Sequence, residues 1–346
     1  MSRYSINRDE LSAVLADQPR FRVDQVWKGL YDELATPSEM TNLPKDLRTK
    51  LDVDLPLALT PVTATESERG DTIKFLFELD GGSRIETVLM LYPDRATVCV
   101  STQAGCAMAC GFCATGQAGF TRHLDVGEIV EQVVRASRRA KDLGRRVSNV
   151  VYMGMGEPLA NEEPVWESIV RLHDDCNMSA RHLTVSTVGI VPGIRRLAER
   201  PLPVNLAVSL HAANDQLRDV LVPINKRYPL AELMKACQDH LDAKGRRLSF
   251  EWAMIDQVND RPSDAVELAS LCRSLSLHAH VNLIPLNPTP GYPVRGSSRA
   301  KVHAFRDQLE SLGVNATVRQ NRGTEIAAAC GQLAAGQPVK ITSRRD

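Results

Sequence analysis

Two absences from this 346-residue sequence narrow its possible functions at once. No apolar run is long enough to span a bilayer, and the polar start MSRYSINRDE is unlike a signal peptide, so we expect a cytoplasmic protein without a membrane segment. Net charge is also missing, because 42 basic residues balance 42 acidic ones. A nucleic-acid partner would therefore need a local basic patch, since the overall field supplies no attraction.

The sequence also lacks a fourth cysteine close to a group of three. Cys106, Cys110 and Cys113 are spaced C-x3-C-x2-C, and none of the next sixty residues is a cysteine. Structural zinc sites and closed iron–sulfur clusters normally take four protein ligands, whereas three thiolates leave one iron of a 4Fe-4S cluster open to a small molecule. A zinc site completed by His123 is the alternative, but the chain has only one C-x2-C pair. The spacing therefore favours the cluster.

This spacing, with Phe112 directly before the last cysteine, resembles the signature of the radical S-adenosylmethionine (SAM) enzymes. The resemblance implies that SAM chelates the open iron and is cleaved to a 5′-deoxyadenosyl radical. Cysteines in a reducing compartment more often bind metal, take part in catalysis or are buried than form a disulfide scaffold. Cys176, Cys237 and Cys272 fall in expected helices, and we interpret them as core or incidental residues.

The chain divides into three parts. Residues 1–60 are expected to form a small helical unit, in which Ser5 or Asn7 can cap the first helix and two later segments carry apolar residues at helical spacing. Residues 61–95 are expected to form an extension, because residues 71–91 alternate apolar and polar side chains around a Gly-Gly turn, as in a β-hairpin.

The third part, residues 96–346, alternates strand and helix patterns. This alternation predicts an α/β fold, a partial TIM-like (βα) barrel of about six parallel strands with its chemistry at the carboxyl ends of the strands. The three-cysteine cluster follows the first of these strands and so lies at that edge. The expected strands are 96–102, 148–154, 182–188, 204–211, 247–255 and 280–286, with a last one possible near residue 320.

Polar residues end four of the other expected strands. After the second strand, Gly156 permits close backbone approach and Glu157 can accept a hydrogen bond from the SAM amino group. Each such residue on its own is as often a simple strand-end cap as a ligand. Four at neighbouring strand ends favour one shared cofactor pocket. The remaining candidates for SAM contact are Ser186, Ser209, Leu210, His211 and Asn287.

Longer runs make the resemblance more specific. STQAGCAMACGFCATGQAGF, GMGEPL, TVSTVGIVPGI, AVSLHA, VNLIPLNP and RGTEIAAACGQL look like the radical SAM RNA adenine methyltransferases, and they occur in that family's order over residues 84–333. The resemblance implies methylation of adenine C2 in 23S ribosomal RNA and in transfer RNA, with two SAM molecules used per turnover. The helical unit 1–60 is similar to that family's accessory RNA-contacting domain.

The resemblance also implies roles for three further residues. Cys330, in AAACGQL, matches the cysteine that accepts a methyl group by nucleophilic substitution and then carries it as a radical to C2. Cys99 matches the thiol that resolves the covalent adduct, which leaves a Cys99–Cys330 disulfide for a cellular reductant to reopen. Glu86 matches the proton acceptor. Without the resemblance, Cys99 and Cys330 are more simply packed core thiols and Glu86 an exposed strand residue.

One residue departs from the family's pattern. The family commonly has D-I-D-A-A-C before the methyl-accepting cysteine, and here Ala327 replaces the second acid. The cysteine and the following GQL are retained, so only the fine positioning of this loop is in question.

Two rival functions remain open. A sister activity that methylates C8 of the same class of adenine would use the same cluster and cysteine pair, whereas a non-catalytic iron–sulfur RNA-binding protein would need neither Cys99 nor Cys330. We expect a monomer served by a flavodoxin-like electron-donor protein. The basic segment 135–146 can contact phosphates, although such runs are more often a solvated helix face, the interpretation we also favour for the basic tail 340–346.

Overall fold

The computed structural model describes residues 1–277, 279–289, 292 and 294–336. Its first segment forms three helices, α1 (Arg8–Val14), α2 (Phe21–Tyr31) and α3 (Lys45–Asp54), as the periodicity predicts. Asn7 caps α1, because its side chain accepts from the Glu10 N–H at 2.9 Å while the Glu10 carboxylate accepts from the Asn7 N–H at 2.8 Å. The basic tail lies outside the described residues.

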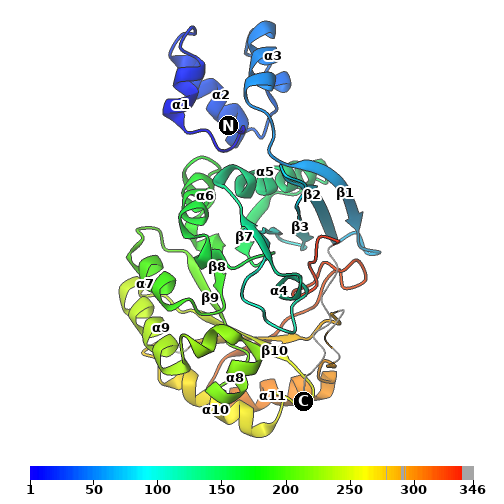
Figure 1. Ribbon diagram of the computed structural model, residues 1–346, viewed down its shortest axis with the longest axis vertical. Helices are drawn as coiled ribbons and strands as arrows, with labels where there is room; N and C mark the ends of the chain where they lie inside the picture. The colour runs from blue at the N-terminus through cyan, green and yellow to red at the C-terminus, as the bar shows by residue number, and fades with distance from the viewer. Residues whose placement is uncertain (278, 290–291, 293, 337–346) are drawn as a thin grey trace.

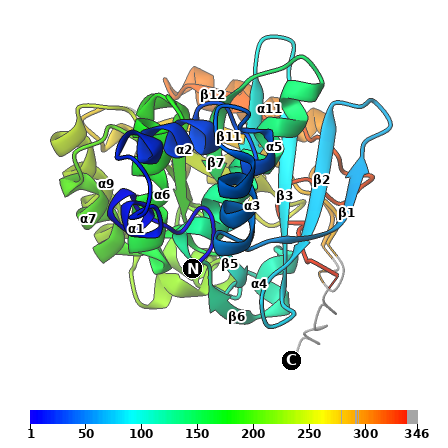
Figure 2. The same ribbon diagram turned by 90° about the horizontal axis from the view of Figure 1, so that it is seen from above.

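The three helices form a lobe that rests on α5 (Val126–Asp142) and α6 (Glu162–Asp174), as Figures 1 and 2 show. Apolar side chains of the lobe share one core with Val126, Val130 and Val134 of α5. The buried Arg171 of α6 donates to the backbone oxygens of residues 4, 5 and 6 at 2.6–3.0 Å, so these carbonyls are satisfied at the junction.

One ten-stranded sheet runs through the rest of the chain, in the order β1-β2-β3-β4-β7-β8-β9-β10-β11-β12. The first four strands are antiparallel, and every pair from β4 onwards is parallel. The strands are β1 (Thr60–Glu66), β2 (Thr72–Glu78), β3 (Arg84–Leu91), β4 (Ala96–Cys99), β7 (Val147–Tyr152), β8 (Leu183–Thr187), β9 (Asn205–Ser209), β10 (Ser249–Met254), β11 (His280–Pro285) and β12 (Ala316–Val318).

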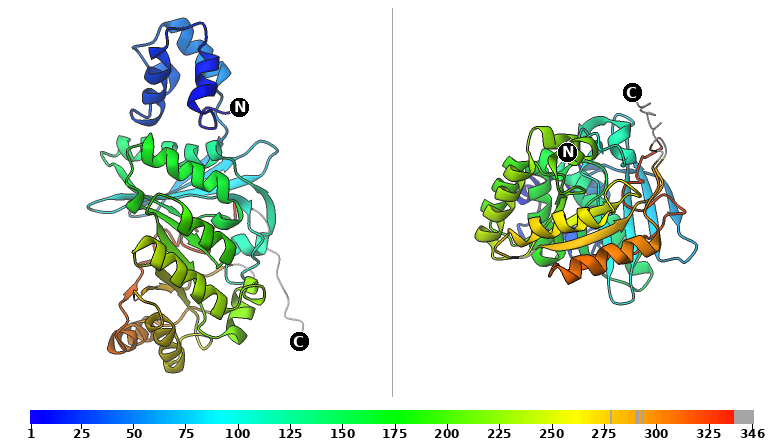
Figure 3. Two further views of the ribbon diagram at one scale, coloured as in Figure 1. Left: turned by 90° about the vertical axis from the view of Figure 1, so that its left-hand side faces the viewer. Right: turned by 90° about the horizontal axis from the view of Figure 1, so that it is seen from below.

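Helices cover the outer side of the curved parallel part, which gives the predicted partial barrel (Figures 1 and 3). The short β12 adds a seventh parallel strand to the six expected ones, at the position left open in the sequence. No helix among the described residues is long and apolar enough to cross a membrane. Besides α5 and α6 the helices of this part are α4 (Ala114–Ala118), α7 (Val191–Glu199), α8 (Asp215–Leu221), α9 (Leu230–Lys244), α10 (Pro262–Arg273) and α11 (Arg299–Ser311).

The predicted hairpin is β2–β3, but β1 beside it was not anticipated. Every residue of β1 is exposed, so it lacks the alternation that a half-buried strand shows. A separate pair, β5 (Gln103–Gly105) and β6 (Phe120–His123), was also unforeseen. These two short strands enclose the three-cysteine segment.

Candidate active site

A cavity of about 430 Å³ opens at the carboxyl ends of the parallel strands. Its wall brings together most of the residues singled out in the sequence, from segments more than 200 residues apart: Cys99, Cys106, Cys110, Cys113, Gly156, Glu157, Ser186, Ser209, His211, Asn287 and Cys330. The volume falls within the range of roughly 300–1,000 Å³ that small-molecule sites occupy. Leu210 and Glu86 are not among the described residues of the wall.

Backbone contacts fold the cysteine segment back on itself. The Cys106 N–H donates to the Gly119 carbonyl at 2.8 Å, and the Cys113 N–H donates to the Cys110 carbonyl at 3.1 Å. Gly105 precedes this loop with φ +75°, and a Cβ there would lie 1.9 Å from the Gly119 oxygen. Only glycine fits such a close strand crossing.

The three thiols suit a polynuclear cluster. Burial raises the pKa of the Cys106 thiol to about 12, and burial followed by the neighbouring thiols raises the pKa of Cys110 well above its usual value. Thiolates in this place would need a strongly cationic partner, which iron supplies. No group of three or more His, Cys, Asp or Glu side chains in the described segments is preformed to hold a metal ion, so the fit is judged from the donor set. The residues present fit the three protein-held corners of a 4Fe-4S cluster.

His123, the residue proposed to complete a zinc site, is engaged elsewhere. Its Nδ1 lies 3.1 Å from the Gln103 side-chain amide, and its ring packs against Phe120. It does not appear in the described wall of the cavity. This arrangement gives no support to the zinc interpretation.

Glu157 is held from within the protein. Its carboxylate accepts from the Leu159 N–H at 3.0 Å and from the Val188 N–H at 2.8 Å, and burial raises its pKa to about 7. A Cβ on Gly156, whose φ is +105°, would lie 2.6 Å from Gln103 Cβ. The backbone at Gly156 thus approaches Gln103 more closely than a side chain would allow, while the Glu157 carboxylate uses two acceptor sites on backbone N–H groups, one in its own loop and one after β8.

His211 lines the cavity as a neutral ring. Its Nδ1 accepts from the Ala253 N–H at 3.0 Å, and burial lowers its pKa to about 3. The ring proton must therefore sit on Nε2, which leaves that atom as a donor. The φ of His211 is +60°, an uncommon left-handed value for a residue other than glycine. The backbone of the adjacent Leu210 is occupied, since its N–H donates to Glu251 and its carbonyl accepts from Arg218.

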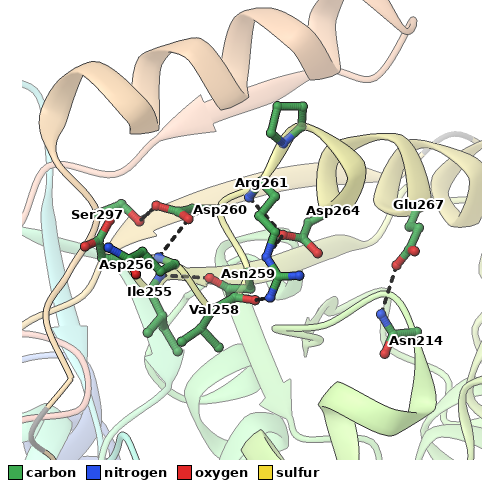
Figure 4. Close-up of polar contacts among 12 residues, drawn as sticks. Asn214, Ile255, Asp256, Val258, Asn259, Asp260, Arg261, Asp264, Glu267 and Ser297 are labelled. Atoms are coloured by element: carbon green, nitrogen blue, oxygen red, sulfur yellow. Dashed lines mark hydrogen bonds and ion pairs between the residues drawn. The ribbon is translucent and has the colours of Figure 1, made fainter.

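Asn259 fixes the His211 turn. Its amide donates to the carbonyls of His211 and Ala253 at 2.9 and 2.7 Å, and its Oδ1 accepts from the Ile255 N–H at 2.8 Å. Figure 4 shows this side chain inside the loop after β10, where Asp260 accepts from Ser297 at 2.8 Å. The sequence analysis did not identify this supporting network.

Cys330 faces the cavity and is exposed to it, so the interpretation as a tightly packed core thiol is wrong. Burial by the surrounding wall nevertheless raises its pKa, an effect that the nearby positive charge of Arg319 partly offsets. Cys99 is buried, as its alternative interpretation required, yet it also lines the cavity. All eight cysteines are free, so no disulfide is present in this state of the chain.

Glu86 is buried on β3, so its interpretation as an exposed strand residue is wrong. The register pairs Val88 with Cys99 directly across β3 and β4, and both line the cavity. Because Glu86 lies two residues before Val88, its side chain is on the same sheet face, one pair beyond the wall. It pairs with Lys74 at 2.9 Å.

Four residues of the wall were not anticipated. The guanidinium groups of Arg95 and Arg322 lie 4.1 and 4.2 Å from the ring centroid of Tyr92, and Arg319 lies on the same wall. Arg319 directly follows β12 and Arg322 lies three residues further on, so the strand-end argument used for the other residues could have found them. These three arginines form a basic patch on the wall, in which Arg322 pairs with Asp71 at 2.8 Å and Arg95 pairs with the exposed Asp94 at 3.2 Å.

The basic helix end at 135–146 is largely paired within the protein. Arg135 pairs with Glu131 at 2.7 Å, and Arg138 pairs with Glu39 of the N-terminal lobe at 2.7 Å. These contacts support the structural interpretation of the segment rather than a phosphate site.

Comparison with known proteins agrees with this geometry. A family model described as the radical SAM superfamily matches residues 100–269. A protein from Roseiflexus castenholzii named probable dual-specificity RNA methyltransferase RlmN is 47% identical and covers 96% of each chain. One of the same name from Parafrankia sp. is 50% identical over 98% of this chain and 93% of its own. The crystal structure of a radical SAM methyltransferase from Sphaerobacter thermophilus is 50% identical, with a TM-score of 0.93 over 97% of this chain and 99% of that one.

Proposed function

This chain belongs to the dual-specificity RNA methyltransferases of the radical SAM superfamily, and on that premise we propose that it methylates C2 of adenine in 23S ribosomal RNA and transfer RNA. The observation that carries the proposal is the exposure of Cys330 on the cavity that Cys99 and the three cluster cysteines also line. A non-catalytic RNA-binding protein has no use for an accessible thiol at this place.

The chemistry explains why a cysteine is needed. C2 lies between two ring nitrogens and is too electron-poor to attack a methyl donor directly. The bound cluster and SAM would supply an electrophilic methyl group in one half-reaction and a hydrogen-abstracting radical in the other. Cys330 takes the methyl group as a thiolate and later presents it to C2, so RNA and protein become covalently joined.

Release falls to Cys99. The adduct first gives up its C2 proton, for which we assign Glu86 as the acceptor, and one electron, which the oxidised cluster would take. The Cys99 thiolate then attacks the Cys330 sulfur. The bond from that sulfur to the methylene carbon breaks, the carbon takes a proton, and the two cysteines are left as a disulfide. A thiol reductant then reopens it. The position of Cys99 on the same wall as Cys330 supports this assignment.

The basic patch accounts for RNA binding despite zero net charge. Arg95, Arg319 and Arg322 place positive charge on the wall where a flipped-out adenine and its flanking phosphates would enter. Guanidinium planes also stack on unpaired bases. A single chain supplies all of these residues, so we propose a monomer. We also propose that it works in the cytoplasm with a flavodoxin-like electron donor.

Nucleoside mass spectrometry tests the proposal. Anaerobically reconstituted protein is incubated with a reductant, methyl-deuterated SAM and unmodified 23S ribosomal RNA fragments or transfer RNA. We expect labelled 2-methyladenosine that lacks one methyl deuterium. Labelled 8-methyladenosine would move the protein to the sister activity, and the absence of methylated adenosine with an intact cluster would contradict the proposal.

A further inference from the structure

Two charged side chains of the β2–β3 hairpin contact the two ends of the segment that carries Cys330, residues 327–335, which we call the Cys330 loop. The Lys74 ammonium donates to the Ala327 carbonyl at 3.2 Å. The Glu86 carboxylate accepts from the Ala334 and Ala335 N–H groups at 2.9 and 3.1 Å. Lys74 and Glu86 are themselves joined at 2.9 Å, so a single ion pair connects the two ends of the loop.

The ion pair is well enclosed. The Lys74 side chain is 15% exposed and that of Glu86 only 6%, and both carboxylate oxygens have partners. A buried ion pair contributes little net stability, because desolvation offsets most of the attraction. What this pair does provide is a fixed position for three backbone groups of a segment that forms no helix or strand.

The middle of the segment is fixed to the cluster loop and the barrel. The Ala114 N–H donates to the Gly331 carbonyl at 2.7 Å, and the Thr115 hydroxyl donates to Leu333 at 2.6 Å. Asn287 donates to the Cys330 carbonyl at 3.1 Å. Figure 1 shows the segment, in red, lying between α4 and the hairpin strands. The Cys330 loop is therefore held on one side by α4 and the barrel and on the other side by the β2–β3 hairpin. The contacts on the hairpin side come from Lys74 and Glu86.

We propose that Lys74 and Glu86 form a clamp that positions the Cys330 thiol to accept its methyl group. The inference rests on the proposed function, and it gives Glu86 a task before any RNA is bound. Lys74 is a positioning residue, since it holds the loop at Ala327 and holds Glu86 at the other end. In-line methyl transfer is sensitive to such positioning, because a displacement of about 1 Å costs up to roughly 100-fold in rate.

The clamp gives Glu86 a second role beside proton acceptance, and the two roles can be tested separately. If Glu86 only accepts the C2 proton, then Glu86→Gln methylates Cys330 normally and accumulates the covalent RNA adduct. If it also clamps the loop, methylation of Cys330 is already slow in the absence of RNA, because the neutral amide loses the ion pair with Lys74. Peptide mass spectrometry of Cys330 after incubation with SAM alone distinguishes the two.

The test compares reconstituted full-length Lys74→Met, Lys74→Arg and Glu86→Gln with a matched control. Arg84 and Glu78 form an exposed ion pair at 2.9 Å on the same hairpin, and within the described part of the chain neither side chain bonds to the Cys330 segment. Arg84→Met therefore removes a hairpin cation without touching the clamp. We expect Cys330 methylation to slow at least about tenfold in Lys74→Met and Glu86→Gln, to recover substantially in Lys74→Arg, and to match the unmodified protein in Arg84→Met.

Hydrogen exchange supplies a second readout that needs no turnover. The amides of Ala334 and Ala335 should exchange faster in Glu86→Gln and Lys74→Met, while the iron content and SAM affinity stay unchanged. The clamp is overturned if Lys74→Met methylates Cys330 at the normal rate, or if Arg84→Met is equally slow. Failure of the proposed function looks different, since the unmodified protein would then form no 2-methyladenosine in RNA, whatever the rates of Cys330 methylation in the clamp variants.

Discussion

Replacing Gly105 with alanine should prevent the protein from holding its iron. A Cβ at Gly105 would lie 1.9 Å from the Gly119 oxygen, and such contacts essentially never fall below 3.0 Å, so the crossing strands must separate by about 1.1 Å. The same oxygen accepts from the Cys106 N–H. The first cluster ligand therefore moves with the strand.

The size of the effect can be separated into two parts. The left-handed φ of +75° alone costs alanine about 1–2 kcal/mol. Gly144 offers a control for this cost, because its φ is +69° and a Cβ there would meet nothing within 4 Å. Displacement of the ligand loop adds to the strain at Gly105, and loss of support around metal ligands typically weakens binding about 10–100-fold.

Iron content and the visible absorption of the cluster after anaerobic reconstitution measure the outcome. Gly105→Ala should lose most of its iron, while Gly144→Ala should match the unmodified protein and lose only about 1–2 kcal/mol of unfolding free energy. Equal iron binding in Gly105→Ala and Gly144→Ala would refute the reasoning, since it would mean that the strand crossing has no influence on Cys106.

Three other outcomes are expected. Burial raises the pKa of Cys330, so the reactive thiolate is a minor species at neutral pH. The rate of Cys330 methylation at saturating SAM should therefore rise about tenfold per pH unit up to that pKa, and a flat profile would contradict a rate-limiting thiolate. Asn259→Ala removes three buried hydrogen bonds around His211. The substitution should lower the unfolding free energy by about 2–4 kcal/mol in denaturant titration and weaken SAM binding. Unchanged SAM affinity would show that the His211 turn keeps its shape without Asn259. Arg95→Gln should reduce RNA affinity and lower the slope of log K against log salt by about one, with Cys330 methylation unaffected; an unchanged slope would place the phosphates elsewhere.

Local signals predicted the parallel barrel and its active edge. The parallel strands β4, β7, β8, β9, β10 and β11 are apolar runs between helical segments, so the spacing of apolar residues and the breaks between runs were enough to predict them and the chemistry at their carboxyl ends. The antiparallel β1 escaped prediction because all of its residues are exposed. Arg319 and Arg322 were missed for a different reason, since β12 is only three residues long and the strand end that they follow was uncertain.

The Cys330 loop marks the limit of sequence reasoning. Its cysteine could be identified from the surrounding AAACGQL, and its place on the cavity from the match to known runs. The residues that support the loop could not be identified in this way, because Lys74 and Glu86 lie about 250 residues away from it in the chain. The alternating pattern of a hairpin also does not show which segment covers the hairpin's inner face. The substitution at Ala327 is informative here. Ala327 contributes its backbone carbonyl to Lys74 and its side chain takes no part in the contact, so the loss of an acid at this position leaves the clamp intact.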